Sequence, residues 1–310
     1  MKIVVAGAKG MVGSAIASEI HQSGADVVRL SRDEVDLENE EATLAFISEL
    51  RPQVIIDAAA KVGGVHANDQ FPVGFFRENI RIQNNLMNAA HLVGVDRFIF
   101  LGSSCIYPRN AAQPIKEEYL FSGPLESTNS AYAMAKLAGI ELINSYRKQF
   151  GHKWISLIPA SVYGPGDNFS VLQSHVIPAL IRKIDSAKKN GINEITLWGD
   201  GSALREFLFV SDLAKAINLC IEKYDSDMPL NVGTGQEISI KELASLISEI
   251  IGYQGPILWD SNKPNGTPRK VLDIGRLKDS GWAPKVSLHD GLVKTVGWYR
   301  DNLDKGVIRL

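Results

Sequence analysis

The residues most able to do chemistry lie near the middle of the chain, where hydroxyl side chains precede a tyrosine and a lysine. Ser103 and Ser104 lead directly into Cys105, and Tyr132 is followed four positions later by Lys136. On a helix, positions i and i+4 share one face, so the tyrosine and the lysine would point the same way. A nearby ammonium lowers the pKa of a tyrosine, which could then donate or accept a proton while Ser103 hydrogen-bonds a carbonyl oxygen. The alternative is that Tyr132 is only an interfacial aromatic residue, because this spacing occurs by chance on many helices.

A glycine-rich turn opens the chain, directly after the apolar run 3–6. Gly7 permits a tight turn, Gly10 lets the backbone approach a pyrophosphate, and Gly13 allows a helix to pack closely on a strand. The free N–H groups at the start of the following helix would then face the phosphates. With the tyrosine and the lysine, this turn predicts a site that moves a hydride to or from a carbonyl. The predicted contacts of the dinucleotide in the turn are Gly7, Ala8, Lys9, Gly10, Met11, Val12 and Gly13.

The choice between NADH and NADPH depends on the end of the next predicted strand, which reads Leu30, Ser31 and Arg32. NAD sites usually carry an acid near this point for the ribose hydroxyls, whereas an arginine suits a 2′-phosphate. Lys9 in the glycine turn adds a second positive charge. Asp33 stands next to Arg32, and both cations could simply be solvated surface residues. The two positive charges favour NADPH.

The composition of the chain argues against several classes of partner. Its 310 residues are 45% hydrophobic and 22% charged, as is usual for globular enzymes, and the net charge is -2. No block of like charges suggests nucleic acid or an anionic membrane as a partner. No apolar run approaches the roughly 20 residues that span a bilayer, and the N-terminus does not resemble a signal peptide. Two cysteines argue against a disulfide framework. We therefore expect a cytoplasmic protein, and we predict no metal site.

Short apolar runs alternate with segments of helical periodicity through the first half of the chain. Such alternation predicts an α/β fold built on a Rossmann-type, doubly wound parallel sheet. Right-handed crossovers place the carboxyl ends of all its strands at one edge, where a cofactor would lie. The predicted strands are 3–6, 26–30, 54–57, 97–101 and 154–158, and the predicted helices are 11–22, 40–50, 71–93 and 130–150.

The pattern changes after residue 164. The next stretch reads as rich in loops, while 207–210 and 230–232 read as strands that rejoin the sheet. The stretch 264–270 contains prolines and a glycine and is expected to lack regular structure.

These features predict two domains. An NADP-binding Rossmann domain would comprise 1–164 plus about 206–234, and a smaller, discontinuous α/β substrate-binding domain would comprise about 165–205 plus 235–310.

Longer segments carry a resemblance to the extended short-chain dehydrogenase/reductase family: 58–64, 101–108, 174–180 and 263–270. Within that family the chain resembles the GDP-L-fucose synthases from end to end. The resemblance implies conversion of GDP-4-keto-6-deoxy-D-mannose to GDP-L-fucose by epimerisation at C3 and C5 and keto reduction at C4. It also implies NADPH, a GDP-sugar substrate and a homodimer.

The resemblance gives Cys105 and His175 a role, because the matching residues of the family exchange protons at C3 and C5 of the keto sugar. Both C–H bonds flank the C4 ketone, so that removal of either proton gives an enolate whose charge Ser103 and Tyr132 could stabilise. Inversion needs a base on one face and an acid on the other, and a thiol and an imidazole both titrate not far from neutral pH. Without the resemblance, Cys105 would be interpreted as a small buried hydrophobe and His175 as a capping or core-edge residue. Cys220 lies in an apolar helical segment and is predicted to be core.

The resemblance also implies contacts beyond the glycine turn. Cofactor contacts are expected at Arg32, Asp36, Leu37, Leu101, Gly102, Ser103, Ser104, Lys136, Pro159, Ala160, Ser161, Val162 and His175. The GDP moiety is expected to be held by Lys183, Trp198, Arg205, Asn265 and Lys270. The two phosphates of GDP need cations, and an indole can pack beside the ligand. Each cation could also be a solvated surface residue. Lys183 stands where some members have arginine, Asn265 where Asp is frequent, and Ser161 where a nearby Asn is common.

Three alternatives remain open at this point. The substrate could be another GDP-4-keto sugar, from a deoxyheptose or colitose pathway, acted on by a C4 reductase or an epimerase/reductase. A dehydratase is disfavoured, because dehydratases of the family carry acidic residues where this chain has Ser104 and Cys105. A non-catalytic NADPH sensor is disfavoured by the complete Ser-Tyr-Lys set.

The expected dimer would use helices 71–93 and 130–150, as the resemblance implies. Apolar residues on them could cover such an interface or could equally belong to the core: Ile80, Leu86, Ile140 and Ile143.

Overall fold

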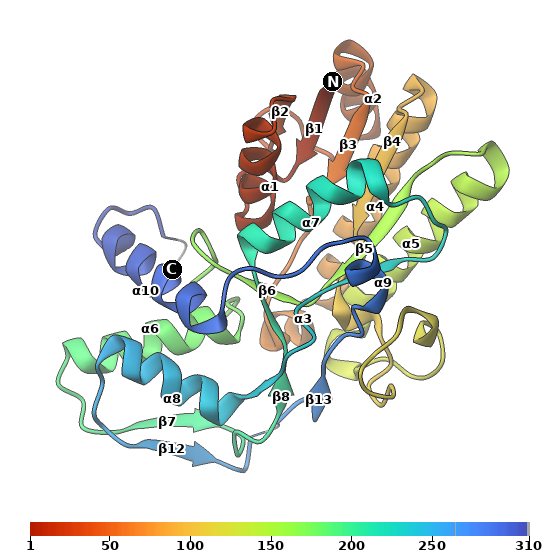
Figure 1. Ribbon diagram of the computed structural model, residues 1–310. Coiled ribbons are helices and arrows are strands. Elements are labelled where there is room, and N and C mark those ends of the chain that lie inside the picture. The colour runs from red at the N-terminus through yellow and green to blue at the C-terminus, as the bar shows by residue number, and fades with distance from the viewer. Residues whose placement is uncertain (264, 309–310) are drawn as a thin grey trace.

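Six parallel strands form the central sheet of the molecule, seen in the upper half of Figure 1. The structure is a computed structural model that describes residues 1–263 and 265–308. Five of the strands are almost wholly buried, as expected for a parallel sheet that helices cover on both faces, and the edge strand 26–30 is only partly buried. Their order is β10 (Leu230–Val232), β5 (Ile155–Pro159), β4 (Arg97–Leu101), β3 (Val54–Asp57), β1 (Lys2–Ala6) and β2 (Asp26–Leu30).

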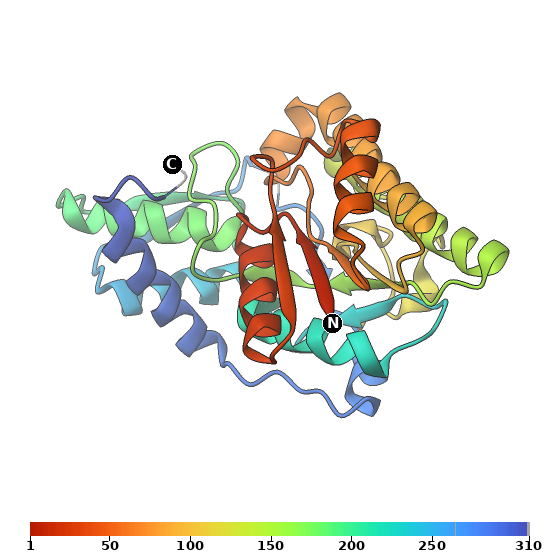
Figure 2. The same cartoon turned by 90° about the horizontal axis from the view of Figure 1, so that it is seen from above.

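Helices cover the two faces of this sheet. α1 (Met11–Gln22) and α7 (Val210–Lys223) pack against each other on one face, while α2 (Glu40–Leu50), α4 (Pro72–Val93) and α5 (Ser130–Phe150) form the layer on the other. Figure 2 shows these two layers from above. The arrangement confirms the predicted doubly wound α/β fold.

Local sequence explains where several of these helices begin and end. Asn39 accepts the backbone N–H of Ala42 at 3.0 Å and so caps the start of α2. α4 begins with Pro72. Proline lacks a backbone N–H, but an N–H in the first turn of a helix has no acceptor within the helix, so no hydrogen bond is lost. Gly94 and Gly151 end α4 and α5 in the left-handed conformation that suits glycine.

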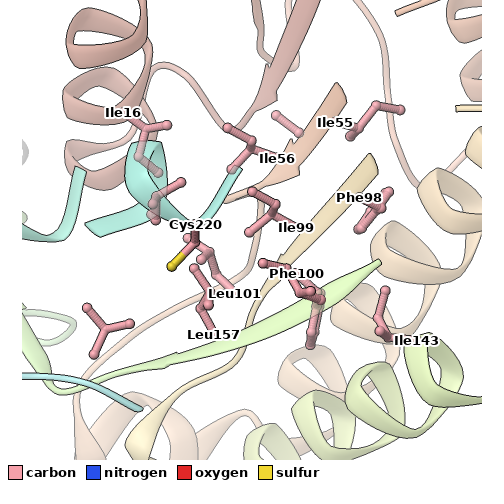
Figure 3. Packing of buried hydrophobic residues seen from close by; sticks show 14 of the residues in the cluster. Ile16, Ile55, Ile56, Phe98, Ile99, Phe100, Leu101, Ile143, Leu157 and Cys220 are labelled. Atoms are coloured by element: carbon pink, nitrogen blue, oxygen red, sulfur yellow. The ribbon is translucent and has the colours of Figure 1, made fainter. Parts of the chain in front are cut away.

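The sheet and its helices share one hydrophobic core, part of which is drawn in Figure 3. Ile16 of α1 and Cys220 of α7 pack with strand residues such as Ile56 and Ile99. Burial raises the pKa of the Cys220 thiol to about 12, so that it stays neutral. The prediction that Cys220 is a core residue is confirmed.

A second hydrophobic cluster lies in the lower part of the molecule in Figure 1. Its elements are α6 (Val176–Lys189), β7 (Ile195–Trp198), α8 (Ile240–Ile251), β12 (Ile257–Asp260) and α10 (Leu288–Leu303), and it also includes residues of β6 (Ser161–Tyr163) and β9 (Phe207–Phe209). The stretch after residue 164 is therefore less rich in loops than predicted, because α6 occupies 14 of its residues.

Two further predictions about this region are wrong. β9 does not rejoin the central sheet; it pairs with β6 in a separate two-stranded sheet, and only β10 of the two predicted strands lies beside β5. Residues 264–270 are not wholly irregular, because β13 (Arg269–Lys270) pairs with β8 (Leu204–Arg205). Pro264 lies outside the described residues.

The remaining short elements connect these layers. They are α3 (Val65–Gln70), α9 (Gly275–Asp279), β11 (Ile238–Ser239) and three 3₁₀ turns, η1 (Ser104–Ile106), η2 (Glu117–Tyr119) and η3 (Ser127–Asn129). Residues 235–310 were predicted to belong to the smaller domain. Three of them nevertheless pack into the core of the central sheet: Leu272, Leu277 and Trp282. The two-domain division stays a prediction.

The apolar residues considered for a dimer interface are mostly core residues. Leu86, Ile140 and Ile143 are buried within the single chain, and Ile80 is partly exposed. Three of the four are thus explained without a partner. Among the described residues, every helix is too short or too polar to span a bilayer.

Candidate active site

The glycine turn has the close packing that a dinucleotide cradle needs. Gly7 has a φ of +77°, and a Cβ added to it would come within 2.6 Å of the carbonyl oxygen of Ala58. A Cβ on Gly13 would lie 2.3 Å from the carbonyl oxygen of Gly7. Gly10, at the start of α1, has no side chain to cap the first N–H groups of the helix, which remain suited to an anion. The residues present therefore fit a dinucleotide pyrophosphate.

The two cations predicted to bind the 2′-phosphate are paired with carboxylates. Lys9 Nζ forms an ion pair with Asp33, and Arg32 Nη2 lies 3.9 Å from Glu78 Oε2. Glu78 also pairs with Lys61. Both predicted cations are largely exposed, and exposed ion pairs contribute little to stability. A phosphate would have to replace these carboxylates as the partner.

The next predicted cofactor contacts lie beside this cation pair. Asp36 is exposed and borders a polar hollow that also includes Arg81 and Asn85. Leu37 is buried, and its carbonyl accepts a hydrogen bond from Asn85 Nδ2 at 2.9 Å. The hollow therefore lies next to a fixed segment of backbone.

The other predicted contacts gather at the carboxyl ends of β4 and β5, as parallel-sheet geometry requires. Leu101 ends β4, and Gly102 donates its N–H to Leu157 at 2.8 Å. Pro159 ends β5, and the following residues Ala160, Ser161 and Val162 lead into and form β6. The structure thus brings the glycine turn and these residues to one edge of the sheet, as predicted.

Lys136 projects from α5 into this edge and is almost fully buried. Its Nζ donates to the carbonyl oxygen of Leu101 at 2.8 Å and lies 4.6 Å from the centre of the Phe100 ring. Burial lowers the pKa of this lysine, and the carboxylate of Asp57 acts in the opposite direction.

Tyr132 lies one helical turn before Lys136. Its side chain is hydrogen-bonded to Ser103, as the two residues were expected to lie close together. A side-chain hydrogen bond to Ser103 lowers the pKa of Tyr132, but burial has the largest effect and raises this pKa. The expected lowering of this pKa by Lys136 is not seen, and the ammonium of Lys136 donates to Leu101. A raised pKa keeps the phenol protonated and hence able to donate.

Cys105 lies where the sheet edge meets the smaller part of the molecule. Its backbone N–H donates to Ser103 Oγ at 3.3 Å, and Lys270 Nζ approaches its Sγ at 3.9 Å. Lys270 is opposite Arg205 in the pairing of β13 with β8. Burial lowers the pKa of the partly buried Arg205 guanidinium, and Cys105 acts against this shift. The backbone of Cys105 is therefore tied to Ser103, and its thiol lies close to the cations Lys270 and Arg205.

His175 occupies the position just before α6, and its ring remains accessible to solvent. Enough protein surrounds the imidazole to lower its pKa by desolvation. The preceding loop is fixed to the sheet side, because Gly64 donates its N–H to Gln173 at 3.0 Å. A Cβ on Gly64 would lie 2.5 Å from the carbonyl oxygen of Ser174. Among the described residues, no hydrogen bond or ion pair joins His175 to Cys105.

The remaining predicted substrate contacts are not in contact with the Cys105 thiol. Lys183 is exposed and donates to the carbonyl oxygen of Thr196. Trp198 is 63% exposed, with Lys263 Nζ 5.5 Å from its ring centre. Asn265 accepts the backbone N–H of Asp200 at 2.9 Å. These three residues form an exposed group on the smaller part of the molecule.

Sequence reasoning missed Asp57, which ends β3 and is fully buried. Burial raises the pKa of this carboxyl to about 6, and Lys136 opposes the shift. The signal was present in the sequence, because a charged residue closes the apolar run Val54–Ile56 at the carboxyl end of a strand. Across residues 1–263 and 265–308, no three His, Cys, Asp or Glu side chains are grouped to hold a metal ion.

Comparison with protein families identifies the class to which this fold and site belong. Residues 3–233 match the NAD dependent epimerase/dehydratase family. This match covers well over half of the chain, so the chain belongs to that family.

Particular relatives narrow the resemblance. The chain is 48% identical over 304 residues to the probable GDP-L-fucose synthase 1 of Oryza sativa subsp. japonica, covering 97% of this chain and 93% of the relative. A GDP-L-fucose synthetase of Naegleria fowleri, solved with NADP bound, superposes with a TM-score of 0.91 at 27% identity, covering 100% of this chain and 96% of that chain. A GDP-6-OMe-4-keto-L-xylo-heptose reductase from C. jejuni also reaches a TM-score of 0.91, at 31% identity, covering 97% and 98% of the two chains.

Proposed function

We propose that this chain converts GDP-4-keto-6-deoxy-D-mannose to GDP-L-fucose by epimerisation at C3 and C5 and reduction at C4. The observation that carries the proposal is the position of Cys105, which lies beside Ser103 and 3.9 Å from Lys270 Nζ. A simple ketone reductase needs Ser103 and Tyr132 but has no need of a thiol at this place. The 48% identity to the rice GDP-L-fucose synthase along nearly the whole chain supports the same substrate.

Epimerisation requires a proton to leave one face of the sugar ring and another to arrive on the opposite face. In our proposal Cys105 and His175 divide these tasks at the carbons that flank the C4 ketone. The lowered pKa of His175 favours the neutral imidazole, which is the form that accepts a proton. Ser103 and Tyr132 donate hydrogen bonds to the C4 oxygen and so stabilise the enolate.

Reduction follows at the same ketone. Bound NADPH supplies the hydride to C4. Tyr132 donates its proton to the C4 oxygen, and its raised pKa keeps that proton in place until the oxygen becomes basic. Lys136 lies at the carboxyl end of β4, where it would hold the nicotinamide ribose. The product alcohol at C4 thus takes one hydrogen from the cofactor and one from the tyrosine.

NADPH is the cofactor that the glycine turn and the two cations fit. Gly7 and Gly13 allow the tight backbone packing of the turn that would hold the pyrophosphate, and Lys9 and Arg32 would exchange their present carboxylate partners for the 2′-phosphate. The NADP found in the Naegleria enzyme supports this assignment.

Recognition of the GDP group belongs to the smaller part of the molecule. Arg205 and Lys270 lie nearest the thiol and would bind the diphosphate, while Lys183, Trp198 and Asn265 would meet the rest of the nucleotide. We further propose a homodimer, and a reducing compartment such as the cytoplasm. Cys105 and Cys220 are free thiols, which is compatible with that compartment.

A second candidate is a reductase of a GDP-4-keto-heptose. The similarity to the C. jejuni enzyme favours it. Ser161 and Asn265, which differ from the usual residues of the GDP-L-fucose synthases, could accommodate a different sugar.

Incubation of the purified protein with GDP-4-keto-6-deoxy-mannose and NADPH tests the proposal, with NMR of the product sugar. GDP-L-fucose is the expected product. A product reduced at C4 but unchanged at C3 and C5 would favour a plain reductase. Tight NADPH binding without turnover of any GDP-keto sugar would favour a sensor.

A further inference from the structure

Asp57 is a buried carboxylate that none of the reaction steps above uses. It is 0% exposed and lies opposite Ala6 of β1 and Phe100 of β4 in the sheet. The N–H of Ala59 donates to its Oδ1 at 3.1 Å. Its Oδ2 is also buried and has no hydrogen-bond partner among the described residues. A buried carboxylate with one oxygen unpaired is unfavourable unless a nearby charge compensates it.

Lys136 provides the compensating charge. It is 3% exposed, and its Nζ lies over the ring of Phe100, which is the strand neighbour of Asp57. The same Nζ donates to Leu101, the next residue of β4. The lysine from α5 and the aspartate from β3 therefore both lie beside Phe100 at this edge of the sheet, with no hydrogen bond between them among the described residues. Each acts on the other, because the ammonium lowers the pKa of the carboxyl and the carboxylate raises the pKa of the ammonium.

Few other charges reach this pair from the surrounding elements. On the glycine turn, Lys9 is exposed and paired with Asp33. On α4, Glu78 is paired with Lys61, and the buried polar side chains of that helix are neutral amides. On α5, the titrating neighbour is Tyr132, whose pKa responds to Cys105 and Ser103. β1 and β4 face the aspartate with Ala6 and Phe100, which carry no charge.

We propose that Asp57 is a positioning residue for the reduction step, whose carboxylate keeps Lys136 charged where it lies at the carboxyl end of β4. This inference rests on the proposed function, since Lys136 matters for reduction only if the chain reduces a ketone. Without the carboxylate, burial alone would act on the lysine and favour its neutral amine. A neutral amine carries no charge for the cofactor and is a weaker hydrogen-bond donor.

The sign of the pH dependence follows from these groups. Asp57 gains its charge as the pH rises through about 6, so above this range the carboxylate can stabilise the ammonium of Lys136. At alkaline pH, the raised pKa of Tyr132 and the lowered pKa of Lys136 make the lysine the first of the two groups to lose its proton. Loss of the Lys136 proton therefore sets the alkaline limit of reduction. Removal of the carboxylate should move that limit to lower pH.

The substitution Asp57→Asn tests this, because it keeps the shape of the side chain and removes the charge. We expect the alkaline limb of kcat for NADPH oxidation to move down by about one pH unit, with the KM for NADPH changed less than about 2-fold. A folded variant whose pH profile matches that of the native protein would overturn the inference.

Asp212→Asn is a matched control. Asp212 on α7 is equally buried, accepts the N–H groups of Lys285 and Val286 at 2.8 Å, and has its Oδ1 unpartnered among the described residues. This variant also removes a buried carboxylate, but away from Lys136. Its pH profile should keep the native limbs. A shift equal to that of Asp57→Asn would mean that loss of any buried carboxylate suffices, and would also overturn the inference.

A second measurement does not need a folded Asp57 variant. NMR of protein labelled with ¹³C at the aspartate carboxyl carbons should show one aspartate that titrates near pH 6, and Lys136→Met should raise that pKa further. Absence of such an aspartate in a protein that does reduce the GDP-keto sugar would remove this inference and leave the proposed function intact. Its presence in a protein without reductase activity would support the pair and sink the proposed function instead.

Discussion

The two sides of the candidate site are prepared for their tasks to different degrees. On the sheet side, Tyr132 is bonded to Ser103 and Lys136 to Leu101, within an edge built from buried parallel strands. On the smaller side, Lys183 and Trp198 are exposed, and Lys183 donates to the backbone carbonyl of Thr196. The fold therefore fixes the groups that react, whereas a ligand would have to gather the groups that recognise it.

This difference makes a prediction about kinetics. Loss of a prepared group should reduce kcat, because it acts in the transition state. Loss of a recognition group should mainly raise KM. Cys105 does not fall into either group, because it contacts Ser103 on the sheet side and Lys270 on the smaller side.

The largest effect is expected for Tyr132→Phe, which removes the proton donor and keeps the edge-on ring contact of Tyr132 with Phe75, whose centre lies 6.3 Å away. Reduction should fall by about 10²–10⁴-fold, the usual contribution of general acid catalysis. The rate of NADPH oxidation measures it, and NADPH binding by fluorescence serves as the control. Retained reduction would show that another group donates the proton.

Cys105→Ser should affect proton exchange rather than reduction. A serine hydroxyl has a far higher pKa than a thiol, so deuterium exchange at the ring carbons should slow by about 10²-fold or more. Cofactor binding should be unchanged, because Cys105 is not among the expected cofactor contacts. Undiminished exchange would remove the thiol from the mechanism.

Arg205→Lys sharpens the comparison on the recognition side. The charge remains but the two-donor geometry is lost, so the KM for the GDP-sugar should rise about 10-fold with kcat nearly constant. Lys183→Arg is the matched change at an exposed position and should leave the KM equal or lower. A fall in kcat for Arg205→Lys at constant KM would contradict the division between the two sides.

The smallest effect is expected at the 2′-phosphate cations. Arg32→Ala should raise the KM for NADPH about 5-fold and leave that for NADH unchanged, because an exposed cation is screened by salt. Glu78→Gln should act in the opposite direction by releasing Arg32 and Lys61. Equal effects of Arg32→Ala on both cofactors would undercut the 2′-phosphate assignment.

Much of the sheet side could be predicted from the sequence. α1 and α2 begin and end at the predicted residues, because a segment with an apolar face of helical period follows the glycine turn in α1 and the capping residue Asn39 in α2. The meeting of the glycine turn with residues 101–103 follows from the rule that parallel strands share one carboxyl edge. The segments that resemble the family also predicted that Cys105 belongs to the site, next to Ser103.

The rest depends on tertiary pairing that short segments do not encode. Phe207–Phe209 reads as a buried strand, but its three residues do not say which sheet it joins. Arg269–Lys270 becomes a strand only because Leu204–Arg205 lies beside it. The pairing of Arg32 with Glu78 joins residues 46 positions apart, and the sequence gives no sign of it. Asp57 could have been noticed as a charge at the end of an apolar strand, but its relation to Lys136 required the fold.

One measurement tests the central claim most directly, namely that a single pocket first exchanges the protons beside a ketone and then reduces that ketone. GDP-4-keto-6-deoxy-mannose is converted with NADPH in D₂O, and the product is examined by NMR. The account predicts GDP-L-fucose with deuterium at C3 and C5 and ordinary hydrogen, delivered from the cofactor, at C4. A reduced product without deuterium at C3 and C5, or with solvent deuterium at C4, would contradict it.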